Sequence, residues 1–389
     1  MEKVTLQQAM KAMSGGDFST AESMLERLVG QEPANLAAWL NLAAVRRQRE
    51  RLDLAFEALH SALRLDNRNF PALLMQATLH ERLGQELQAA DAFGVALAQA
   101  PPDSALDPVT LKVVERARTL HARHVARMRE FIRERSLDAL IDCRPALRHR
   151  LDAFIDSTLR VRPRYQQEPS DYWYPGLPAI EFYEREEFPW LPDLEAATEV
   201  IRVELLEVLR VDNGSFSPYI HYPDHAPLEQ WRELNHSPKW TSYNFFEAGT
   251  LMPERCARAP QTMRALSKLP MPHVSGRSPT AVFSHLLPHT RIPPHNGAAN
   301  FRLVVHLPLV LPNNCGFRVG SQVREWRMGE AWVFDDTIEH EAWNASEEMR
   351  TILICDIWNP RLAEDERRAI AHVVAASDEF RGLQPGSTT

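Results

Sequence analysis

The chain has 389 residues, of which 44% are hydrophobic and 25% are charged. This composition is ordinary for a soluble globular protein, and the length favours two or three domains. The net charge of −8 gives no reason to expect nucleic acid as a partner. No run of about 18 apolar residues occurs and the first residues lack the apolar core of a leader, so we expect no membrane partner and no secretion. The cysteines are far apart without a CxxC pair, which favours a reducing, cytoplasmic setting over a disulfide scaffold.

Residues 1–105 contain a helical pattern that repeats every 34 residues. The positions that keep this spacing are Ala21, Ala55 and Ala89, then Gly16, Glu50 and Gly84, and then Pro33, Asn67 and Pro101. The pattern resembles tetratricopeptide repeats, in which small residues at fixed points let one helix approach the next. Each helix pair buries a face only against its neighbour, which creates a concave groove. We expect either a docking surface for a polypeptide or a scaffold and dimerisation element.

Residues 106–165 are predicted to form a helical connector. Apolar residues recur at helical spacing over Leu111–Arg135, and a second helix is expected over Pro145–Leu159. The arginines on the first of these helices are typical of a solvated helix face, although such a stripe could also touch an anionic surface. Prolines and aromatic residues over Pro163–Leu177 mark the boundary to the next domain.

Residues 166–380 change character from helical to β-rich. A helix over Leu194–Leu209, an irregular proline- and aromatic-rich tract over Phe216–Phe246 and a helical turn over Pro260–Leu266 come first. The strands expected after them are Ala281–Leu287, Phe301–Leu311, Gly316–Val319, Val323–Met328, Ala331–Phe334, His340–Asn344 and Arg350–Trp358. Short strands at this spacing predict a β-sandwich or a jelly roll. The expected fold class is therefore multi-domain α plus β, with helical repeats followed by a double-stranded β-helix of the jelly-roll or cupin-like type. A last helix over Ala363–Ser377 precedes a tail, residues 381–389, that is expected to be disordered.

Two histidines in the β-rich region, His295 and His340, lie 45 residues apart. A pair of histidines on separate jelly-roll strands is the arrangement of non-haem iron oxygenases. Those sites usually add a carboxylate two residues after the first histidine, but here that residue is Gly297. Water could fill the position, or Asp335 or Asp336 could supply the third ligand, or no metal binds at all.

Side chains suited to a dicarboxylate occur near both histidines. Arg350 opens the strand after the second histidine, and a guanidinium can hold a carboxylate through two parallel hydrogen bonds. Ser284, on the strand before the first histidine, can add a hydroxyl donor. Arg302 and His306 lie four residues apart and therefore on one face of a strand. Together these side chains could bind both ends of 2-oxoglutarate, and burying them without a ligand would be costly.

From about Tyr172 to Arg361 the sequence resembles the aspartyl/asparaginyl β-hydroxylase family, which are iron(II)- and 2-oxoglutarate-dependent dioxygenases. The resemblance is carried by the strings Tyr174-Pro175-Gly176-Leu177, Phe188-Pro189-Trp190-Leu191, Ile292-Pro293-Pro294-His295-Asn296-Gly297, Arg302-Leu303-Val304-Val305-His306-Leu307, Phe334-Asp335-Asp336 and Glu339-His340-Glu341-Ala342-Trp343. The ordered combination is specific, although each string alone is weak. Tetratricopeptide repeats ahead of this domain also resemble the architecture of the family's longer members.

The resemblance implies an Fe(II) site held by His295 and His340 without the usual carboxylate. It further implies 2-oxoglutarate and O2 as cosubstrates, with succinate and CO2 released. Implied contacts to 2-oxoglutarate come from Ser284 and Arg350 at one end and from His306 at the other, with Trp240 lining the pocket.

One departure from the family pattern is Val304, where eukaryotic members tend to carry a second basic residue. Either cosubstrate binding then rests on His306 and Arg302, or the charged group of the substrate is met differently. The expected function is hydroxylation of the β-carbon of Asp or Asn, or a related side chain, in a peptide or protein that the repeats could dock. The alternatives are the same chemistry on a lipid acyl chain or small molecule, and a non-catalytic repeat-containing interaction protein.

Overall fold

The computed structural model describes residues 5–140, 145–223, 225 and 229–382. The tail expected to be disordered therefore lies outside the described residues from position 383 onward. The chain divides into two compact units, Met1–Val161 and Arg162–Thr389. In the described part of the chain, no helix is long and apolar enough to cross a membrane.

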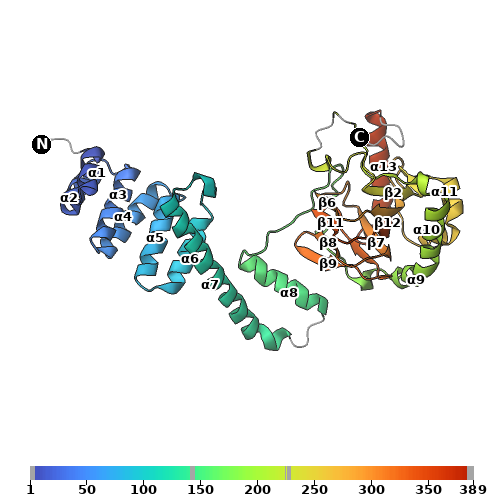
Figure 1. Ribbon diagram of the computed structural model, residues 1–389, viewed down its shortest axis with the longest axis horizontal. Coiled ribbons are helices and arrows are strands. Elements are labelled where there is room, and N and C mark those ends of the chain that lie inside the picture. The colour runs from blue at the N-terminus through green and yellow to red at the C-terminus, as the bar shows by residue number, and fades with distance from the viewer. Residues whose placement is uncertain (1–4, 141–144, 224, 226–228, 383–389) are drawn as a thin grey trace. The chain divides into compact units, whose positions relative to one another are not determined.

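The N-terminal unit consists of successive antiparallel helix pairs (Figure 1). These helices are α1 (Leu6–Ser14), α2 (Phe18–Gln31), α3 (Leu36–Gln48), α4 (Leu52–Leu65), α5 (Phe70–Arg82) and α6 (Glu86–Leu97). Gly16, Glu50 and Gly84 have φ angles of 79°, 58° and 70°, so each position of this set reverses the chain between the two helices of a pair. The 34-residue period in the sequence thus reflects the regular recurrence of the same left-handed turn conformation.

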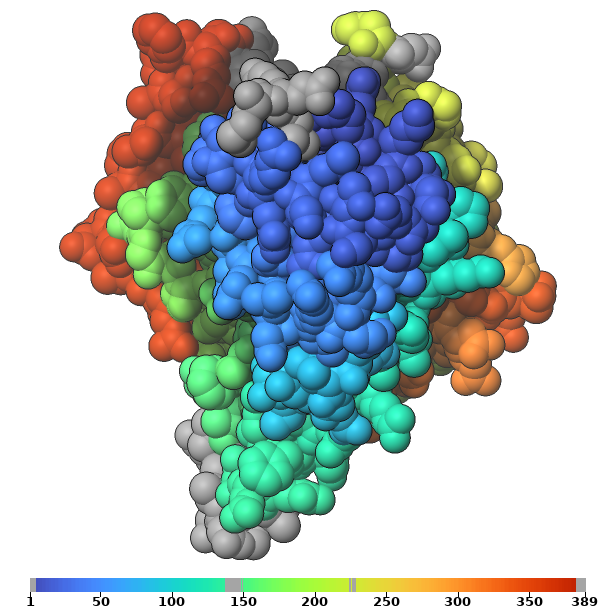
Figure 2. All heavy atoms as spheres, turned by 90° about the vertical axis from the view of Figure 1, so that its left-hand side faces the viewer, coloured from blue at the N-terminus to red at the C-terminus, as the bar shows by residue number. Residues whose placement is uncertain are grey.

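Helix caps and core residues of the repeats keep the same period. Asn35 and Asn69 lie 34 residues apart, and each accepts a hydrogen bond from a backbone N–H of the helix that it precedes. Ala21, Ala55 and Ala89 are buried where neighbouring helices touch. The tetratricopeptide character expected from the sequence is confirmed, and in a space-filling view the first helices form a continuous packed surface (Figure 2).

Two long helices complete the N-terminal unit. Helix α7 (Pro108–Leu140) packs its first turns on α6 through Val114 and Ala117. Helix α8 (Pro145–Thr158) carries Asp152 and Asp156, which pair with two arginines of α7, Arg133 and Arg129, with nitrogen–oxygen distances of 2.6 Å each. Part of the arginine stripe of the predicted connector is therefore paired with the neighbouring helix.

The C-terminal unit is built on two facing antiparallel sheets. One has six strands in the order β1-β2-β5-β12-β7-β10, and the other has four in the order β6-β11-β8-β9. The strands are β1 (Ser217–Pro218), β2 (Trp240–Asn244), β5 (Ala281–Leu286), β6 (Thr290–His295), β7 (Arg302–Val310), β8 (Cys315–Val319), β9 (Gln322–Glu325), β10 (Trp332–Phe334), β11 (His340–Asn344) and β12 (Arg350–Trp358), and a small hairpin adds β3 (Phe246–Glu247) and β4 (Thr250–Leu251). The predicted fold class, helical repeats followed by a jelly-roll domain, is confirmed.

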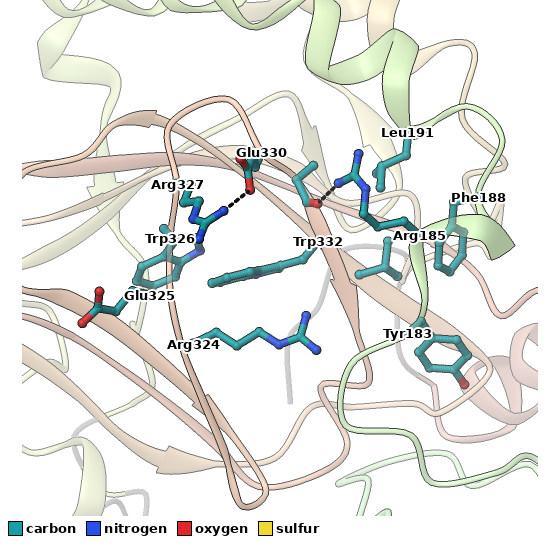
Figure 3. Close-up of a pocket in the computed structure, with 12 residues that line it drawn as sticks. Tyr183, Arg185, Phe188, Leu191, Arg324, Glu325, Trp326, Arg327, Glu330 and Trp332 are labelled. Carbon is teal, nitrogen blue, oxygen red and sulfur yellow. Dashed lines mark hydrogen bonds and ion pairs between the residues drawn. The ribbon is translucent and has the colours of Figure 1, made fainter. Parts of the chain in front are cut away.

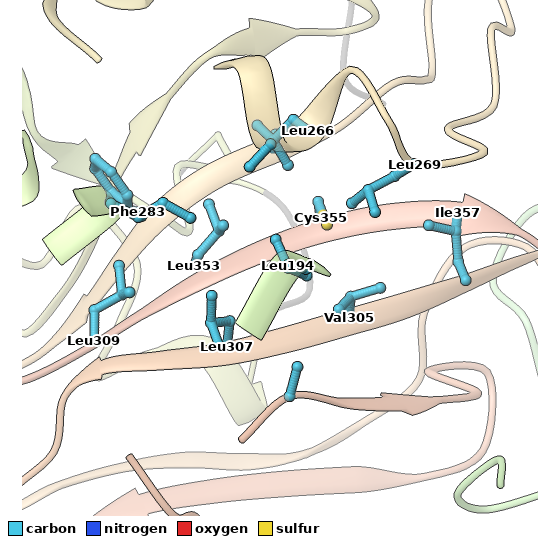
Figure 4. Close-up of a cluster of buried hydrophobic side chains, with 14 of the residues drawn as sticks. Leu194, Leu266, Leu269, Phe283, Val305, Leu307, Leu309, Leu353, Cys355 and Ile357 are labelled. Carbon is cyan, nitrogen blue, oxygen red and sulfur yellow. The ribbon is translucent and has the colours of Figure 1, made fainter. Parts of the chain in front are cut away.

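Helices cover the outer face of the six-stranded sheet. They are α9 (Leu191–Ala196), α10 (Thr198–Val211), α11 (Pro253–Arg258) and α12 (Pro260–Leu266), and α13 (Glu364–Phe380) packs near the C-terminal end of β12. Figure 4 shows Leu194 and Leu266 from two of these helices meeting Val305, Leu307 and Leu353 of the sheet. Burying a side chain of this size stabilises the fold by about 1.5–3 kcal/mol. Because α9–α12 occupy this outer face, the inner face of the same strands is left for the site.

Two predictions about secondary structure were wrong in detail. The helix expected over Leu194–Leu209 is two helices, α9 and α10, separated at Ala197. The tract expected to be irregular contains β2, and the segment between the first two predicted strands contains β6, which includes Pro293 and Pro294. Prolines are tolerated in β6 because it is an edge strand, where a missing N–H breaks no ladder on the open side.

Candidate metal and dicarboxylate site

The structure brings the two predicted histidines together. Strand β6 ends at His295 and β11 begins at His340, and these two residues face each other in the antiparallel register of the two strands. The centroids of their imidazole rings are 4.0 Å apart, with an angle of 50° between the ring planes. The pairing of these strands, which the sequence does not reveal, thus brings together two histidines that lie 45 residues apart in the chain.

Each histidine is oriented by a backbone carbonyl two residues before it. Nδ1 of His295 lies 2.8 Å from the carbonyl oxygen of Pro293, and Nδ1 of His340 lies 3.1 Å from that of Ile338. A carbonyl oxygen only accepts hydrogen bonds, so both Nδ1 atoms carry the proton and both Nε2 atoms keep a free lone pair. This tautomer is the one that binds a metal through Nε2.

Burial keeps both imidazoles neutral. It lowers the pKa of His295 to about 3, with the neighbouring His340 ring as the second cause, and it lowers the pKa of His340 to about 4. Desolvation disfavours the charged form of a histidine. At pH 7 the pair therefore offers two neutral nitrogen donors.

The two aspartates proposed as third ligands have different surroundings. Both carboxylate oxygens of Asp335 are engaged, one by the backbone N–H and hydroxyl of Thr337 and the other by the amide of Gln167 at 2.5 Å. Asp336 accepts a hydrogen bond from Arg302 at 3.1 Å through Oδ2, while its buried Oδ1 has no hydrogen-bond partner among the described residues. Asp335 is therefore committed to holding its loop, and Asp336 alone keeps a free oxygen.

Gly297 leaves the space that Asp336 fills. A Cβ atom built on Gly297 would lie 2.1 Å from Oδ2 of Asp336, a separation that atoms do not adopt. A carboxylate at this position of the sequence is thus excluded unless Asp336 moves. No cluster of three or more His, Cys, Asp or Glu side chains that could hold a metal occurs within residues 5–140, 145–223, 225 and 229–382. The donors available are therefore the histidine pair.

Arg350 lies at the inner face of β12 and is almost completely buried, with 1% of its surface exposed. In the part of the chain that the structure describes, no ion pair or hydrogen bond engages its guanidinium, and its Nε is buried without a partner. The guanidinium carbon lies 5.0 Å from the centre of the Trp326 ring. Burial lowers the pKa of Arg350 to about 10, so the group is still charged at pH 7. A buried cation of this kind is the expected partner of a carboxylate.

Ser284 and Trp240 complete this end of the site. The indole N–H of Trp240 donates to the hydroxyl oxygen of Ser284 at 3.0 Å, and both residues are buried. The hydroxyl proton of Ser284 is therefore left to donate to another group. Ser284 is opposite Ile352 in the β5–β12 register, two residues from Arg350, so the two polar side chains share the inner face.

His306 and Arg302 both lie on the inner face of β7, as predicted from their spacing. His306 is buried between the rings of Phe334 and Phe317, at centroid distances of 4.7 and 5.0 Å, and its Nδ1 is buried without a partner. Burial, with the Arg350 charge as a second cause, holds the pKa of His306 well below its usual range. Arg302 differs from the other site residues because it is already ion-paired with Asp336.

The tract before β5, which the sequence placed at the border of the substrate entrance over Tyr219–Tyr243, supplies two aromatic walls that were not singled out, Trp231 and Tyr219. Trp231 meets the His295 ring edge-on with 5.0 Å between centroids. Tyr219 stacks on Trp240 with centroids 4.0 Å apart and an interplanar angle of 6°. The only signal in the sequence was the density of aromatic residues in this tract.

A strap at the start of the C-terminal unit was also missed. The backbone N–H of Glu168 donates to Thr337, and that of Ser170 donates to Gly297, at 2.8 and 3.0 Å. These carbonyls belong to the two loops that carry the histidines, so the strap fixes both loops. Its residues carry no motif, and only the contacts identify it.

Comparison with known proteins finds relatives of the C-terminal unit. A family profile described as "Aspartyl/Asparaginyl beta-hydroxylase" matches residues 195–360, which include all seven predicted site residues. The human aspartyl/asparaginyl beta-hydroxylase is 31% identical over 179 residues, covering 46% of this chain and 22% of that protein. The mouse aspartate beta-hydroxylase domain-containing protein 2 is 28% identical over 214 residues, covering 54% and 60%. The ornithine lipid ester-linked acyl 2-hydroxylase of Rhizobium tropici is 30% identical over 189 residues, covering 48% and 62%.

The fold consists of a jelly-roll domain that follows a tetratricopeptide-like helical unit. Within the jelly-roll domain, residues 195–360 are similar to the aspartyl/asparaginyl β-hydroxylase family. The matched segments span between 22% and 62% of the length of these three relatives.

Proposed function

We propose that this chain is an iron(II)- and 2-oxoglutarate-dependent hydroxylase. The observation that carries the proposal is Arg350, a buried guanidinium that has no ion pair or hydrogen bond among the described residues and lies in the same inter-sheet site as the His295–His340 pair. An unpaired buried charge costs several kcal/mol, whereas a bound carboxylate would convert that cost into binding energy. The contact with the Trp326 ring offsets only part of this cost.

The metal would be held through Nε2 of His295 and His340. Their Nδ1 hydrogen bonds to backbone carbonyls fix the ring orientation before the metal arrives. Asp336 would face the metal side with its free Oδ1, while Gly297 provides the room for that carboxylate. A metal held there would supply, with 2-oxoglutarate and O2 as cosubstrates, the oxidation of a C–H bond to an alcohol, and succinate and CO2 would be the other products.

Cosubstrate orientation is the task of the inner-face polar side chains. Arg350 and the free hydroxyl proton of Ser284 would hold the carboxylate far from the metal. His306, whose buried Nδ1 lacks a partner, would meet the other end of the molecule. Arg302 is a weaker candidate for direct contact, because its charge is already balanced by Asp336. Trp240 and Trp231 are both buried next to His295, and these rings would limit the access of water to the site.

For the substrate, we propose a peptide or protein in which an Asp or Asn side chain, or a related one, is hydroxylated at the β-carbon. The family match and the name of the human relative support this substrate class. The helical repeats add a second support, since arrays of this kind form concave surfaces that suit an extended polypeptide.

A second candidate substrate is a lipid acyl chain. It is favoured by Val304, which is buried in the apolar cluster between the sheets, next to an arginine that is already ion-paired. The apolar surroundings of Val304 would suit an acyl methylene group as well as a polar side chain. The name of the Rhizobium tropici relative, an acyl 2-hydroxylase, points the same way.

Iron-dependent succinate release tests the proposal. The purified chain is supplied with Fe(II), ascorbate, 2-oxoglutarate and either a peptide library or acylated lipids, and products are read by mass spectrometry. We expect turnover with peptides and its loss in His340→Ala, while His289→Ala keeps it because that histidine is exposed and paired only with Glu347. Turnover with lipids alone selects the second candidate. Absence of iron-dependent succinate with every substrate, together with unaltered metal binding in His340→Ala, would refute the proposed function.

A further inference from the structure

A second pocket lies in the C-terminal unit, on the side of β9 and β10. It has a volume of about 490 Å³ and is lined by Arg324, Trp326, Trp332, Arg185, Phe188 and Glu330, among others (Figure 3). Neither histidine of the proposed metal site lines it, nor do Ser284, His306 or Arg350. Its size is within the range of about 300–1,000 Å³ that is usual for small-molecule sites.

Arg324 is the cation of this pocket that has no carboxylate partner. Arg185 is paired with Glu195 at 2.7 Å and Arg327 with Glu330 at 3.8 Å. Arg324 forms no ion pair with any residue that the structure describes, and its one hydrogen bond, to the amide oxygen of Gln322, is long at 3.3 Å.

The Arg324 guanidinium is held in place by aromatic packing. Its carbon lies 3.9 Å from the centre of the Phe182 ring, and burial lowers the pKa of the group. Glu325 follows on the opposite face of β9, and Figure 3 shows its carboxylate directed away from the guanidinium. The charges of Glu184 and Glu181 act on Arg324 from a distance and raise its pKa, but burial is the larger effect and neither glutamate forms an ion pair with it among the described residues. The charge of Arg324 is thus partly desolvated, oriented and without a direct carboxylate contact, which suits the binding of an anion.

The walls of the pocket are apolar and aromatic. Trp332 and Trp326 stack with centroids 5.5 Å apart and an interplanar angle of 29°, and Phe188 and Leu191 lie across from them. Such walls bind the apolar body of a ligand, while one guanidinium fixes its charged end. An inorganic anion would leave these walls in contact with water.

We propose that this pocket binds a small organic carboxylate with an aromatic or aliphatic body, held by Arg324. The site is separate from that of 2-oxoglutarate, but Trp326 is common to both. This tryptophan lines the pocket, its ring centre is 5.0 Å from the guanidinium carbon of Arg350, and only 5% of its surface is exposed.

Fluorine NMR of the full chain labelled with 5-fluorotryptophan tests the proposal, with phenylacetate as the probe. We expect saturable shifts of the Trp332 and Trp326 resonances, the first assigned with Trp332→Phe and the second with Trp326→Phe. Phenylacetamide has the same shape without the charge, and it should bind about tenfold to a hundredfold more weakly, the size of a charge-assisted hydrogen bond. Saturating 2-oxoglutarate with Mn(II) should not compete.

Two matched substitutions locate the charge. Arg324→Gln should weaken phenylacetate binding by about the same factor as loss of the ligand's charge. Arg327→Gln removes an arginine from the rim whose side chain is 79% exposed, and it should leave the affinity within twofold. If Arg324→Gln proves unfolded, the difference in affinity between phenylacetate and phenylacetamide for the native chain still tests whether the pocket recognises the carboxylate. Equal binding of the two probes, no saturable shift, or displacement by 2-oxoglutarate overturns the proposal.

Discussion

Replacing Arg350 with methionine should stabilise the ligand-free protein while abolishing its response to 2-oxoglutarate. Burial lowers the pKa of Arg350 from its ordinary value to about 10, and each pKa unit corresponds to about 1.4 kcal/mol. Keeping this side chain charged in the folded state therefore costs about 3 kcal/mol, an order-of-magnitude value. Because the folded pKa is the lower one, the cost is present at every pH below about 10 and is relieved only as the pH rises from there toward the pKa of the unfolded chain.

Methionine fills a similar volume without a charge, so Arg350→Met should gain about 1–3 kcal/mol in the free energy of unfolding. Part of the gain is offset because the cation–π contact with Trp326 is lost, which is worth about 0.5–2 kcal/mol. Urea denaturation of the full chain without ligand measures the difference. Arg318→Met is the matched control, since Arg318 is largely buried but bonded to Glu339 at 2.7 Å and to Glu341 at 2.5 Å. This control should be destabilised by about 1.5–3 kcal/mol, because it removes charged hydrogen bonds from Glu339 and from the buried Glu341, which keeps its ion pair with Arg291.

The second half of the same experiment adds 2-oxoglutarate with Mn(II). A ligand at a hundred times its Kd stabilises the native chain by about 2.7 kcal/mol, whereas Arg350→Met should show no such increase. The reasoning is refuted if Arg350→Met is less stable than the native chain by more than about 1 kcal/mol and 2-oxoglutarate stabilises both to the same extent. That outcome would mean that Arg350 has a structural role and holds no ligand.

Three further predictions concern individual side chains. His340→Ala should lose at least tenfold in Co(II) affinity measured by absorption titration, since half of the donor pair is removed, and unchanged affinity would exclude this histidine as a ligand. Burial lowers the pKa of His285 to about 3, so the stability that its neutral form contributes is complete above pH 6.5 and decreases as the pH falls toward 3. The free energy of unfolding of His285→Phe, measured by denaturation, should therefore fall less steeply with decreasing pH, by up to about 1.4 kcal/mol per pH unit. Parallel pH profiles of the variant and the native chain would contradict this. Gly297→Ala should lower the free energy of unfolding by about 1–3 kcal/mol, because the added Cβ meets the Asp336 carboxylate. The control Gly30→Ala, whose Cβ would have nothing within 4 Å, should be neutral or stabilising. Equal effects of the two substitutions on the melting temperature would disprove the clash.

Much of the fold follows from local patterns in the sequence. The repeats could be predicted because the same turn, cap and small-residue positions recur, and each needs only a local conformation, such as the left-handed one at Gly16, Glu50 and Gly84. Strands such as β8, β11 and β12 were predicted within a residue or so, because runs of β-branched and aromatic residues report burial on a sheet. Strand β6 was missed because its prolines imitate a turn, and only its edge position makes them acceptable.

The sequence by itself determined which kinds of side chain are available for the site: two histidines, an arginine that opens a strand, and a serine and a second histidine on inner-facing positions. The tertiary structure decided how they are used. The pairing of β6 with β11 joins His295 to His340, the hydrogen bond from Trp240 leaves the Ser284 proton free, and Asp336 neutralises Arg302 while Arg350 stays unpaired. The physical reason is that periodicity records which face of a strand is buried, whereas register and partners depend on strands that lie far apart in the chain.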